Sequence, residues 1–166
     1  MEKGNDRVTT EIEILEFRAG GNSYGISVGD IKEILVYDKK PTPVPNAHQC
    51  IEGIIMPRDF LIPIIDLKKY LNLADVDTNK NEMIIVTGIG NMNVAIHVDS
   101  VCGIHRKMSS DIKKPGKMMS TNQKFAITGI IKMEDKIIEL IDLRKIISNI
   151  NPDINLEQDD SLISVG

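Results

Sequence analysis

The chain has 166 residues and a formal net charge of −4 at neutral pH, which argues against a nucleic-acid-binding protein, because such proteins usually carry a basic face. No apolar run approaches the roughly 18 residues that cross a bilayer, and the polar N-terminus does not resemble a secretory signal peptide. The two cysteines, Cys50 and Cys102, are too few for a disulfide framework, so we expect a cytoplasmic protein with ordinary thiols.

The start of the chain predicts a disordered segment followed by a β-hairpin. Residues 1–10 are polar and are expected to be disordered, whereas residues 11–19 form a strand-like run with apolar side chains among polar ones. Gly20-Gly21-Asn22 is a strong turn signal, and residues 24–28 are expected to return as the partner strand. Residues 29–34 fit either a helical turn or the start of the next strand.

A proline-rich connector separates this hairpin from a sequence repeat. Three prolines within residues 39–45 predict an extended segment, and residues 47–51 fit one turn of helix. Residues 53–71 (GIIMPRDFLIPIIDLKKYL) then recur 76 positions later as residues 129–147 (GIIKMEDKIIELIDLRKII). Two copies of one pattern indicate a supersecondary unit that is used twice.

Each copy of the repeat predicts the same order of elements. A short isoleucine-rich run, a charged turn and a second apolar run are typical of a β-hairpin. An aspartate follows, Asp66 in one copy and Asp142 in the other. Its carboxylate can accept hydrogen bonds from the free amides at the start of a helix. We therefore predict that both aspartates cap short helices.

The second half of the chain repeats the first. Residues 74–81 lack apolar periodicity and mark a boundary, and residues 82–89 and 94–98 predict a second hairpin. Each half supplies about five short strands, which cannot leave both sheet edges open and stay soluble, so we predict a mostly β fold of two similar small β-barrels. The expected segments are the first half over residues 11–75, the second half over residues 76–150 and a tail over residues 151–166.

The sequence offers little support for catalysis or for a bound metal. His97, Cys102 and His105 form a loose grouping, but their spacing matches no standard zinc pattern, so core or surface roles are favoured. The glycines at residues 20–21 and 88–90 do not precede a helix in a strand–loop–helix unit, as a phosphate-binding loop requires. We predict no catalytic, cofactor-binding or metal-binding residues, and a binding module rather than an enzyme.

Arg58 is the strongest candidate for a binding residue. It lies at the predicted hairpin tip of the first repeat copy, where the second copy has Glu134. A repeat maintained only for folding has no reason to invert charge there, so we predict that Arg58 reaches a carboxylate of a partner. Met118-Met119 could offer adaptable contact surface, whereas Met56 is expected to lie in the core.

Several of these segments resemble the CheW domain of bacterial chemotaxis. The residues that carry the resemblance in the first half are Tyr24-Gly25-Ile26, Ile31, Glu33-Ile34, Ile51-Glu52-Gly53-Ile54, Arg58 and Ile62-Pro63-Ile64-Ile65-Asp66-Leu67. The second half is similar to the CheV-type branch of the family, in the segments His97-Val98-Asp99-Ser100-Val101 and Ile104-His105-Arg106. Met56-Pro57-Arg58 in the first half also resembles that branch. The resemblance runs from about Glu11 to Ile150.

The resemblance implies two SH3-like five-stranded β-barrels with short helical turns, a shared apolar interface and no active site. It also implies an adaptor that couples the cytoplasmic tips of methyl-accepting chemoreceptors to the regulatory domain of the histidine kinase CheA. Neither nucleic acid nor direct membrane insertion is expected. By position, the partner-binding residues that the resemblance implies are Ile31, Glu33, Ile34, Gly53 and Arg58.

The chain departs from the family pattern beside this arginine. Pro57 and Asp59 replace the family's Leu and Gly, which changes the hairpin and places a carboxylate next to Arg58, so receptor binding could be weakened or retuned. CheV proteins also carry a C-terminal phospho-receiver domain, which we do not expect in a chain ending at Gly166. Two alternatives stay open: a CheV-type fragment without its receiver, and an adaptor for a kinase array outside chemotaxis.

Overall fold

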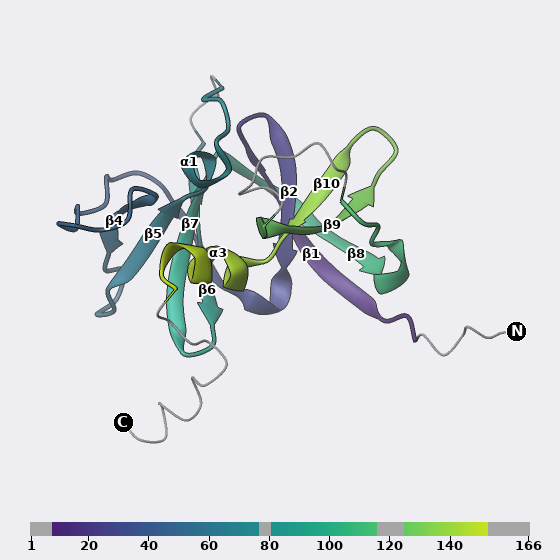
Figure 1. Cartoon of the computed structure of the whole chain (residues 1–166), viewed down its shortest axis with the longest axis horizontal. Coiled ribbons are helices and arrows are strands. Elements are labelled where there is room, and N and C mark those ends of the chain that lie inside the picture. Colours follow the sequence, from purple (N-terminus) through teal and green to yellow (C-terminus); the bar gives the residue numbers. More distant parts are fainter. Residues whose placement is uncertain (1–7, 77–80, 116–124, 153–166) are drawn as a thin grey trace, which may run out of the picture.

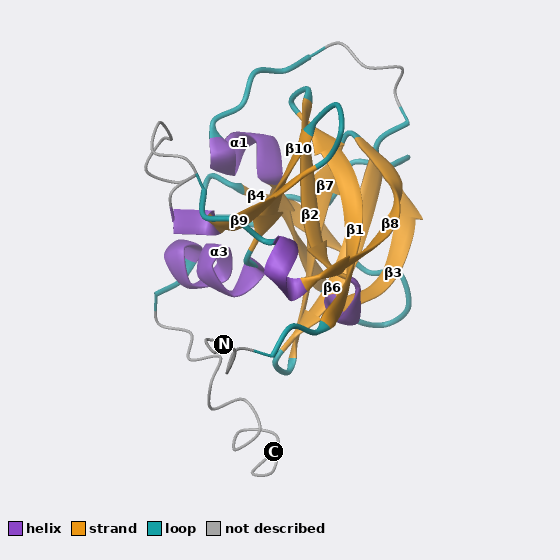
Figure 2. Cartoon of the chain, turned by 90° about the vertical axis from the view of Figure 1, so that its right-hand side faces the viewer, coloured by secondary structure: helices purple, strands orange, loops and turns teal. Residues whose placement is uncertain are grey.

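The computed structural model describes residues 8–76, 81–115 and 125–152. Within these ranges ten strands form two five-stranded sheets, and the helices are few and short. Figure 1 shows the two sheets side by side, and Figure 2 shows helices α1 and α3 lying together beside the strands. The predicted mostly β fold with two five-stranded units is therefore confirmed.

The two sheets have equivalent strand orders. The first sheet, in the order β8-β1-β2-β10-β9, contains β1 (Glu11–Ala19), β2 (Asn22–Ser27), β8 (Ser100–Met108), β9 (Ile127–Lys132) and β10 (Ile137–Ile141). The second sheet, in the order β3-β6-β7-β5-β4, contains β3 (Ile31–Val36), β4 (Ile51–Ile55), β5 (Ile62–Asp66), β6 (Met83–Ile89) and β7 (Met92–Val98). In each sheet one strand pair is parallel, β2 with β10 and β5 with β7.

The sequence repeat corresponds to a structural repeat. Strands β4 and β5 and helix α1 (Leu67–Leu71) match strands β9 and β10 and helix α3 (Leu143–Ile150). Asp66 accepts a hydrogen bond from the backbone N–H of Lys69 at 3.1 Å, and Asp142 accepts one from Arg144 at 3.0 Å. The predicted capping role of both aspartates is confirmed.

The two sheets do not follow the boundary near residue 75. After the β1–β2 hairpin, the chain passes through the short 3-10 helix η2 (Val28–Asp30) into β3 of the other sheet, and after the β6–β7 hairpin it crosses back into β8. Each sheet thus takes strands from both predicted segments, 11–75 and 76–150. A hairpin turn sets only the pairing of its own two strands, so the partner of the third strand is decided by tertiary packing.

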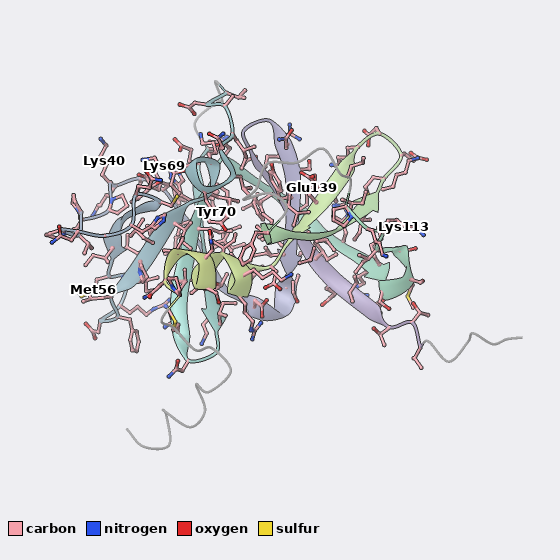
Figure 3. All side chains as sticks on the ribbon, viewed as in Figure 1. Lys40, Met56, Lys69, Tyr70, Lys113 and Glu139 are labelled. Carbon is pink, nitrogen blue, oxygen red and sulfur yellow. The ribbon has the colours of Figure 1, made fainter. Side chains whose placement is uncertain are left out.

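The main hydrophobic core lies between the two sheets. Its fully buried side chains come from both sheets and both helices, and include Phe17, Tyr24, Ile65, Leu67, Tyr70, Ile85, Ile96 and Ile146. Tyr70 lies at the centre of the molecule (Figure 3) and donates a hydrogen bond to Asn149, which joins α1 to α3. A smaller cluster, consisting of Ile62, Ile64, Ile84, Val86 and Ala95, fills the interior of the second sheet.

Neither sheet closes into a barrel through a full ladder. In the described residues, the segment that follows β3 makes one bridge to β4, Thr42 with Ile54. The segment that follows β8 makes the equivalent bridge to β9, Lys113 with Ile130. The edge strands of each sheet are therefore joined by a single bridge, so side-chain contacts across this opening matter for how firmly the unit closes.

Several local expectations change in the structure. Residues 29–34 divide between η2 and β3, whereas residues 47–51 contain a hydrogen-bonded turn rather than a helix. Met56 is 63% exposed on the β4–β5 hairpin (Figure 3), so the predicted core position is wrong, because the hairpin tip projects beyond the sheet. Met118-Met119, and most of residues 1–10 and 151–166, lie outside the described residues.

Candidate partner-binding site

Arg58 and Glu33 form an ion pair between the two edges of the second sheet. Arg58 lies in the β4–β5 hairpin, and its Nη1 and Nη2 donate to Oε1 and Oε2 of Glu33 in β3, at 2.7 and 3.3 Å. The Arg58 side chain is nevertheless 71% exposed. The carboxylate that Arg58 reaches in this structure thus belongs to its own chain, and the pair joins β3 to the hairpin.

Strand β3 separates the predicted apolar residues by their burial. Ile31 is half-buried and packs against the main core. Ile34 is 38% exposed, and Val36 is exposed on the same face because side chains alternate along a strand. Of the predicted residues on β3, Ile34 therefore exposes apolar surface to solvent, whereas Ile31 packs against the main core.

Gly53 has a backbone role in β4. It lies at a β-bulge with φ of +156°, and a Cβ atom there would collide with the backbone carbonyl of Thr42. Thr42 and Ile54 exchange two backbone hydrogen bonds, at 3.0 and 2.8 Å, directly beside this glycine. Gly53 thus allows the proline-rich connector to dock against β4.

A groove with exposed apolar side chains lies beside Pro57, the chain neighbour of Arg58. It has a volume of about 620 Å³ and runs between the end of β3 and the β4–β5 hairpin. The exposed apolar side chains that line it are Val36, Met56 and Leu61. Sequence reasoning missed this groove, because Met56 and Leu61 were read as parts of apolar runs, and only the projection of the hairpin exposes them.

The first sheet exposes apolar side chains at equivalent positions. Ile104 in β8 corresponds to Ile34 at the repeat offset of 70, and Ile137 in β10 corresponds to Leu61 at the offset of 76. All four are exposed. The two sheets therefore present related apolar surfaces on different parts of the molecule.

The structure separates the three residues of the loose His–Cys grouping. His97 belongs to the second sheet, whereas His105 lies in the first sheet and contacts Glu16 at 2.8 Å. Cys102 is exposed, Cys50 is buried, and both thiols are free. Among the described residues, no group of three or more His, Cys, Asp or Glu side chains is placed to hold a metal ion.

Two polar networks replace that grouping, and both escaped sequence reasoning. His97 contacts the carboxylates of Glu52 and Glu82. Burial alone would lower the pKa of His97, but the two carboxylates have the larger effect and raise the pKa above its ordinary value. Glu16 is 1% exposed, and burial alone would raise its pKa. An ion pair with Lys136 and a hydrogen bond from His105 instead lower the pKa of Glu16.

The repeat contained a signal for one of these networks. At the offset of 70 residues, Glu16 occupies the position that the buried Val86 holds in the other copy. A carboxylate in place of a core valine indicates a buried partner of opposite charge. That comparison could have directed attention to Lys136 and His105 before the structure was known.

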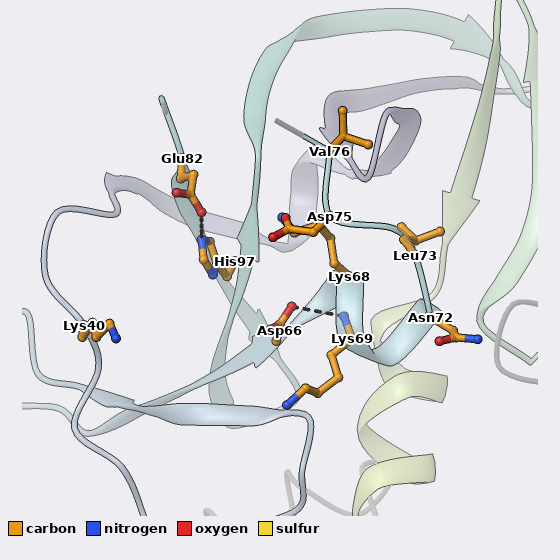
Figure 4. A pocket seen from close by; sticks show the side chains of 10 residues that line it. All are labelled: Lys40, Asp66, Lys68, Lys69, Asn72, Leu73, Asp75, Val76, Glu82 and His97. Carbon is orange, nitrogen blue, oxygen red and sulfur yellow. Dashed lines mark hydrogen bonds and ion pairs between the residues drawn. The ribbon is translucent and has the colours of Figure 1, made fainter. Parts of the chain in front are cut away.

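A polar pocket beside α1 has mixed charge. It measures about 1040 Å³, and its lining residues include Lys40, Asp66, Lys68, Lys69, Asp75, Glu82 and His97 (Figure 4). Lys68 forms ion pairs with Asp75 at 2.7 Å and with Asp99 at 3.0 Å, which raises the pKa of the lysine although burial opposes this. With positive and negative side chains side by side, the pocket does not favour a ligand of either charge.

Comparison with known proteins agrees with this architecture. A CheW-like domain model matches residues 13–151, and no helix in the described residues is long and apolar enough to cross a membrane. The chain is 28% identical over 140 residues to chemotaxis protein CheW of Bacillus subtilis, covering 84% of this chain and 89% of that protein. It is 30% identical over 171 positions to chemotaxis protein CheV3 of Helicobacter pylori, covering 93% of this chain and 52% of that protein.

A solved structure shows the same fold. Scaffolding protein TtCheW from Thermoanaerobacter tengcongensis superimposes with a TM-score of 0.70 at 30% identity, covering 80% of this chain and 90% of that chain. The sequence resemblance to CheW and CheV proteins is thus confirmed by the family model, by the relatives and by the fold. The chain belongs to the CheW-like domain family, whose matched members are chemotaxis scaffold proteins.

Proposed function

We propose that the chain is a non-enzymatic, cytoplasmic adaptor that couples chemoreceptors to a kinase. Its partners are the regulatory domain of a CheA-type histidine kinase and the cytoplasmic tip of a methyl-accepting chemoreceptor. Membership of the CheW-like family supports a scaffold role. The adaptor needs no cofactor, no nucleic acid and no direct insertion into the membrane, because it associates with receptor arrays through its partners.

The observation that carries this proposal is the Arg58–Glu33 ion pair, with the exposed Ile34 next to Glu33 along β3. These three residues are here termed the adaptor surface. Protein interfaces combine apolar centres with polar rims, and arginine is common among the residues that contribute most to affinity. Ile34 supplies exposed apolar area, and the ion pair holds the guanidinium in one orientation. A guanidinium carries five N–H donors, so Arg58 can still bind a partner's carboxylate while it contacts Glu33.

The duplicated fold supports the binding of two partners. An adaptor must hold both at once, so it needs two separate surfaces. Ile34 and Leu61 on the second sheet, and Ile104 and Ile137 on the first, provide apolar area at equivalent positions of the two units. We assign the adaptor surface to one partner and the equivalent region of the first sheet to the other.

Calorimetry with the purified regulatory domain of the CheA kinase from the same organism tests the proposal. We expect a dissociation constant on the order of micromolar, a typical value for a transient signalling interface. The same titration is repeated with receptor-tip fragments. A Glu33→Lys variant should weaken binding of one partner by about tenfold or more and leave the other unchanged. Normal binding of both partners would remove the adaptor surface from the proposal.

The same measurements separate the two alternatives. An adaptor for a kinase array outside chemotaxis would fold identically but would bind neither CheA nor chemoreceptor fragments. A CheV-type fragment would come from a longer native protein. Intact-mass measurement on the protein purified from its own cells distinguishes this case, since the present chain accounts for 18.5 kDa.

A further inference from the structure

His97 lies at the centre of a closed ring of side chains in the second sheet. Its Nδ1 contacts Oε2 of Glu52 at 2.5 Å, and its Nε2 contacts Oε1 of Glu82 at 2.7 Å. The Tyr37 ring stacks on the imidazole with centroids 3.7 Å apart and planes inclined by 5°. The Tyr37 hydroxyl donates to Oε1 of Glu52 at 3.0 Å, which completes the ring.

The four side chains lie in, or directly beside, four different strands. His97 is on the inner strand β7 and Glu52 is on the edge strand β4. Tyr37 follows the other edge strand, β3, and its backbone N–H donates to the carbonyl of Glu82, which precedes β6. The ring therefore spans the opening between β3 and β4, where the backbone of the described residues supplies only the bridge of Thr42 with Ile54.

Two ionised carboxylates, one at each ring nitrogen, are both satisfied only by an imidazole that carries two protons. A neutral histidine carries one N–H and one lone pair, so it can donate to only one of two carboxylates. Only 11% of the His97 side chain and 15% of the Glu52 side chain are exposed, against 33% for Glu82, so water replaces a lost contact poorly on the Glu52 side. When the imidazole of His97 loses one proton, one of the two carboxylates faces a nitrogen lone pair and no longer has a hydrogen-bond donor.

The surroundings of His97 favour the protonated form. The groups that face it are Glu52 from β4, Glu82 before β6, Tyr37 after β3 and Asp66 at the end of β5, with Lys40, Lys68 and Lys69 on the wall of the adjoining pocket. Lys68 is already paired with Asp75 and Asp99. Two carboxylates thus bond the imidazole directly, and a tyrosine ring covers one face of it, an arrangement that also stabilises a cation.

We propose that His97 is a proton-dependent clasp that holds the two edge strands of the second sheet together and opens when the imidazolium loses a proton. The clasp lies beside the adaptor surface, because β3 carries Glu33 and Ile34, while β4 leads into the hairpin with Arg58. Opening the clasp would loosen both elements. Its effect on partner binding rests on the proposed function, whereas its effect on the chain itself does not.

The direction of the pH dependence follows from linkage. Burial would lower the pKa of His97, but Glu52 and Glu82 outweigh it and raise the pKa above the ordinary value near 6.5. A group whose pKa is higher in the folded state stabilises the fold fully below its unfolded pKa. That contribution is lost as the pH rises through the folded pKa, so the second sheet is expected to loosen as the pH increases above the ordinary histidine value near 6.5.

Histidine NMR on the complete chain tests the clasp. The chain has three histidines, and we expect His97 to retain both ring N–H protons to a pH above the ordinary histidine value near 6.5. Glu82→Gln should lower the His97 midpoint, because it removes one of the two carboxylates. Tyr37→Phe should lower the midpoint less, since the ring still stacks. A His97 that titrates at or below the midpoint of an exposed histidine overturns the proposal.

Urea unfolding gives a second and independent measurement. Between about pH 6 and about pH 9, wild-type protein should lose more of its unfolding free energy than His97→Gln. Parallel curves for wild type and His97→Gln would overturn the clasp. If His97→Gln does not fold, the NMR titrations of wild type and Glu82→Gln decide the question. Partner binding at the same pH values is measured separately, so failure of the adaptor function and failure of the clasp give different results.

Discussion

The guanidinium of Arg58 binds both carboxylate oxygens of Glu33, at 2.7 and 3.3 Å, across 25 residues of sequence. Arg58 was expected to bind a partner's carboxylate, and the structure shows a carboxylate of its own chain in that place. The pair fixes the β4–β5 hairpin against β3, so the arginine is held in one orientation before any partner arrives. Such preorganisation reduces the entropy lost on binding.

Replacing Arg58 should affect binding far more than folding. Arg58→Glu places two carboxylates beside each other, but both the arginine and the hairpin are exposed. We expect the unfolding free energy to change by less than about 1 kcal/mol, as for other surface ion pairs. Partner affinity should fall by about tenfold or more, measured by calorimetry.

Arg106 offers a matched control for this variant. It is as exposed as Arg58 and pairs with Glu13 at 3.0 Å on the first sheet. Arg106→Glu should leave the partner of the adaptor surface bound normally. The charge-swapped double variant, Arg58→Glu with Glu33→Arg, should recover hairpin order but not affinity. Equal loss in Arg58→Glu and Arg106→Glu would point to a general effect of net charge.

The exposed isoleucines should separate the two proposed surfaces. Ile34→Asp introduces a charge into apolar contact area, so it should weaken one partner by about tenfold or more. Ile104→Asp, at the equivalent position of the first sheet, should weaken the other partner. Thermal melts of both variants should stay close to wild type, because neither side chain is buried. Loss of the same partner in both variants would contradict the assignment of two surfaces.

Gly53 should be among the least replaceable residues of the second sheet. Ala at Gly53 would require an unfavourable backbone conformation and would push against the carbonyl of Thr42. We expect Gly53→Ala to reduce the unfolding free energy by about 2–4 kcal/mol in urea titrations.

Gly103 isolates the backbone contribution to this loss. It has a similar φ of +154° in β8, but an added Cβ would meet no atom within 4 Å. Gly103→Ala should therefore cost only the conformational part, about 1–2 kcal/mol. If both alanine variants lose the same free energy, contact with Thr42 does not limit position 53.

The buried Glu16 should make the first sheet sensitive to acid. Glu16→Gln removes the charge that Lys136 contacts at 2.7 Å, and should cost about 1–3 kcal/mol at neutral pH. Burial would raise the pKa of Glu16, but Lys136 and His105 lower it, so its stabilising contribution is present above its unfolded pKa and is lost as the pH falls. Wild-type stability should therefore decrease more steeply below about pH 5 than that of Glu16→Gln.

Glu139 is the control of opposite sign. It lies in β10 of the same sheet, and burial raises the pKa of its carboxyl group. A carboxylate whose pKa is raised by burial opposes folding at neutral pH. Glu139→Gln should thus leave stability unchanged or increase it. Similar losses in Glu16→Gln and Glu139→Gln would show that the ion pair with Lys136 does not stabilise the sheet.

The sequence by itself determined the repeated unit and its local structure. The isoleucine-rich runs, the turn at Gly20-Gly21-Asn22 and the caps Asp66 and Asp142 act through neighbours a few residues away, so their pattern predicts hairpins and helix starts correctly. The same short-range signals, used twice, predicted two five-stranded units. The resemblance to the CheW domain was also carried by these segments.

Only the tertiary structure decided how the units combine and which side chains meet. Strand β3 lies in a different sheet from β1 and β2, and β8 lies in a different sheet from β6 and β7. Met56 is exposed, Arg58 pairs with Glu33, and His97 contacts two carboxylates. Each of these contacts links residues at least 15 positions apart, or depends on which surface a strand packs against. No local preference specifies such a choice, because burial and long-range pairing are properties of the assembled core.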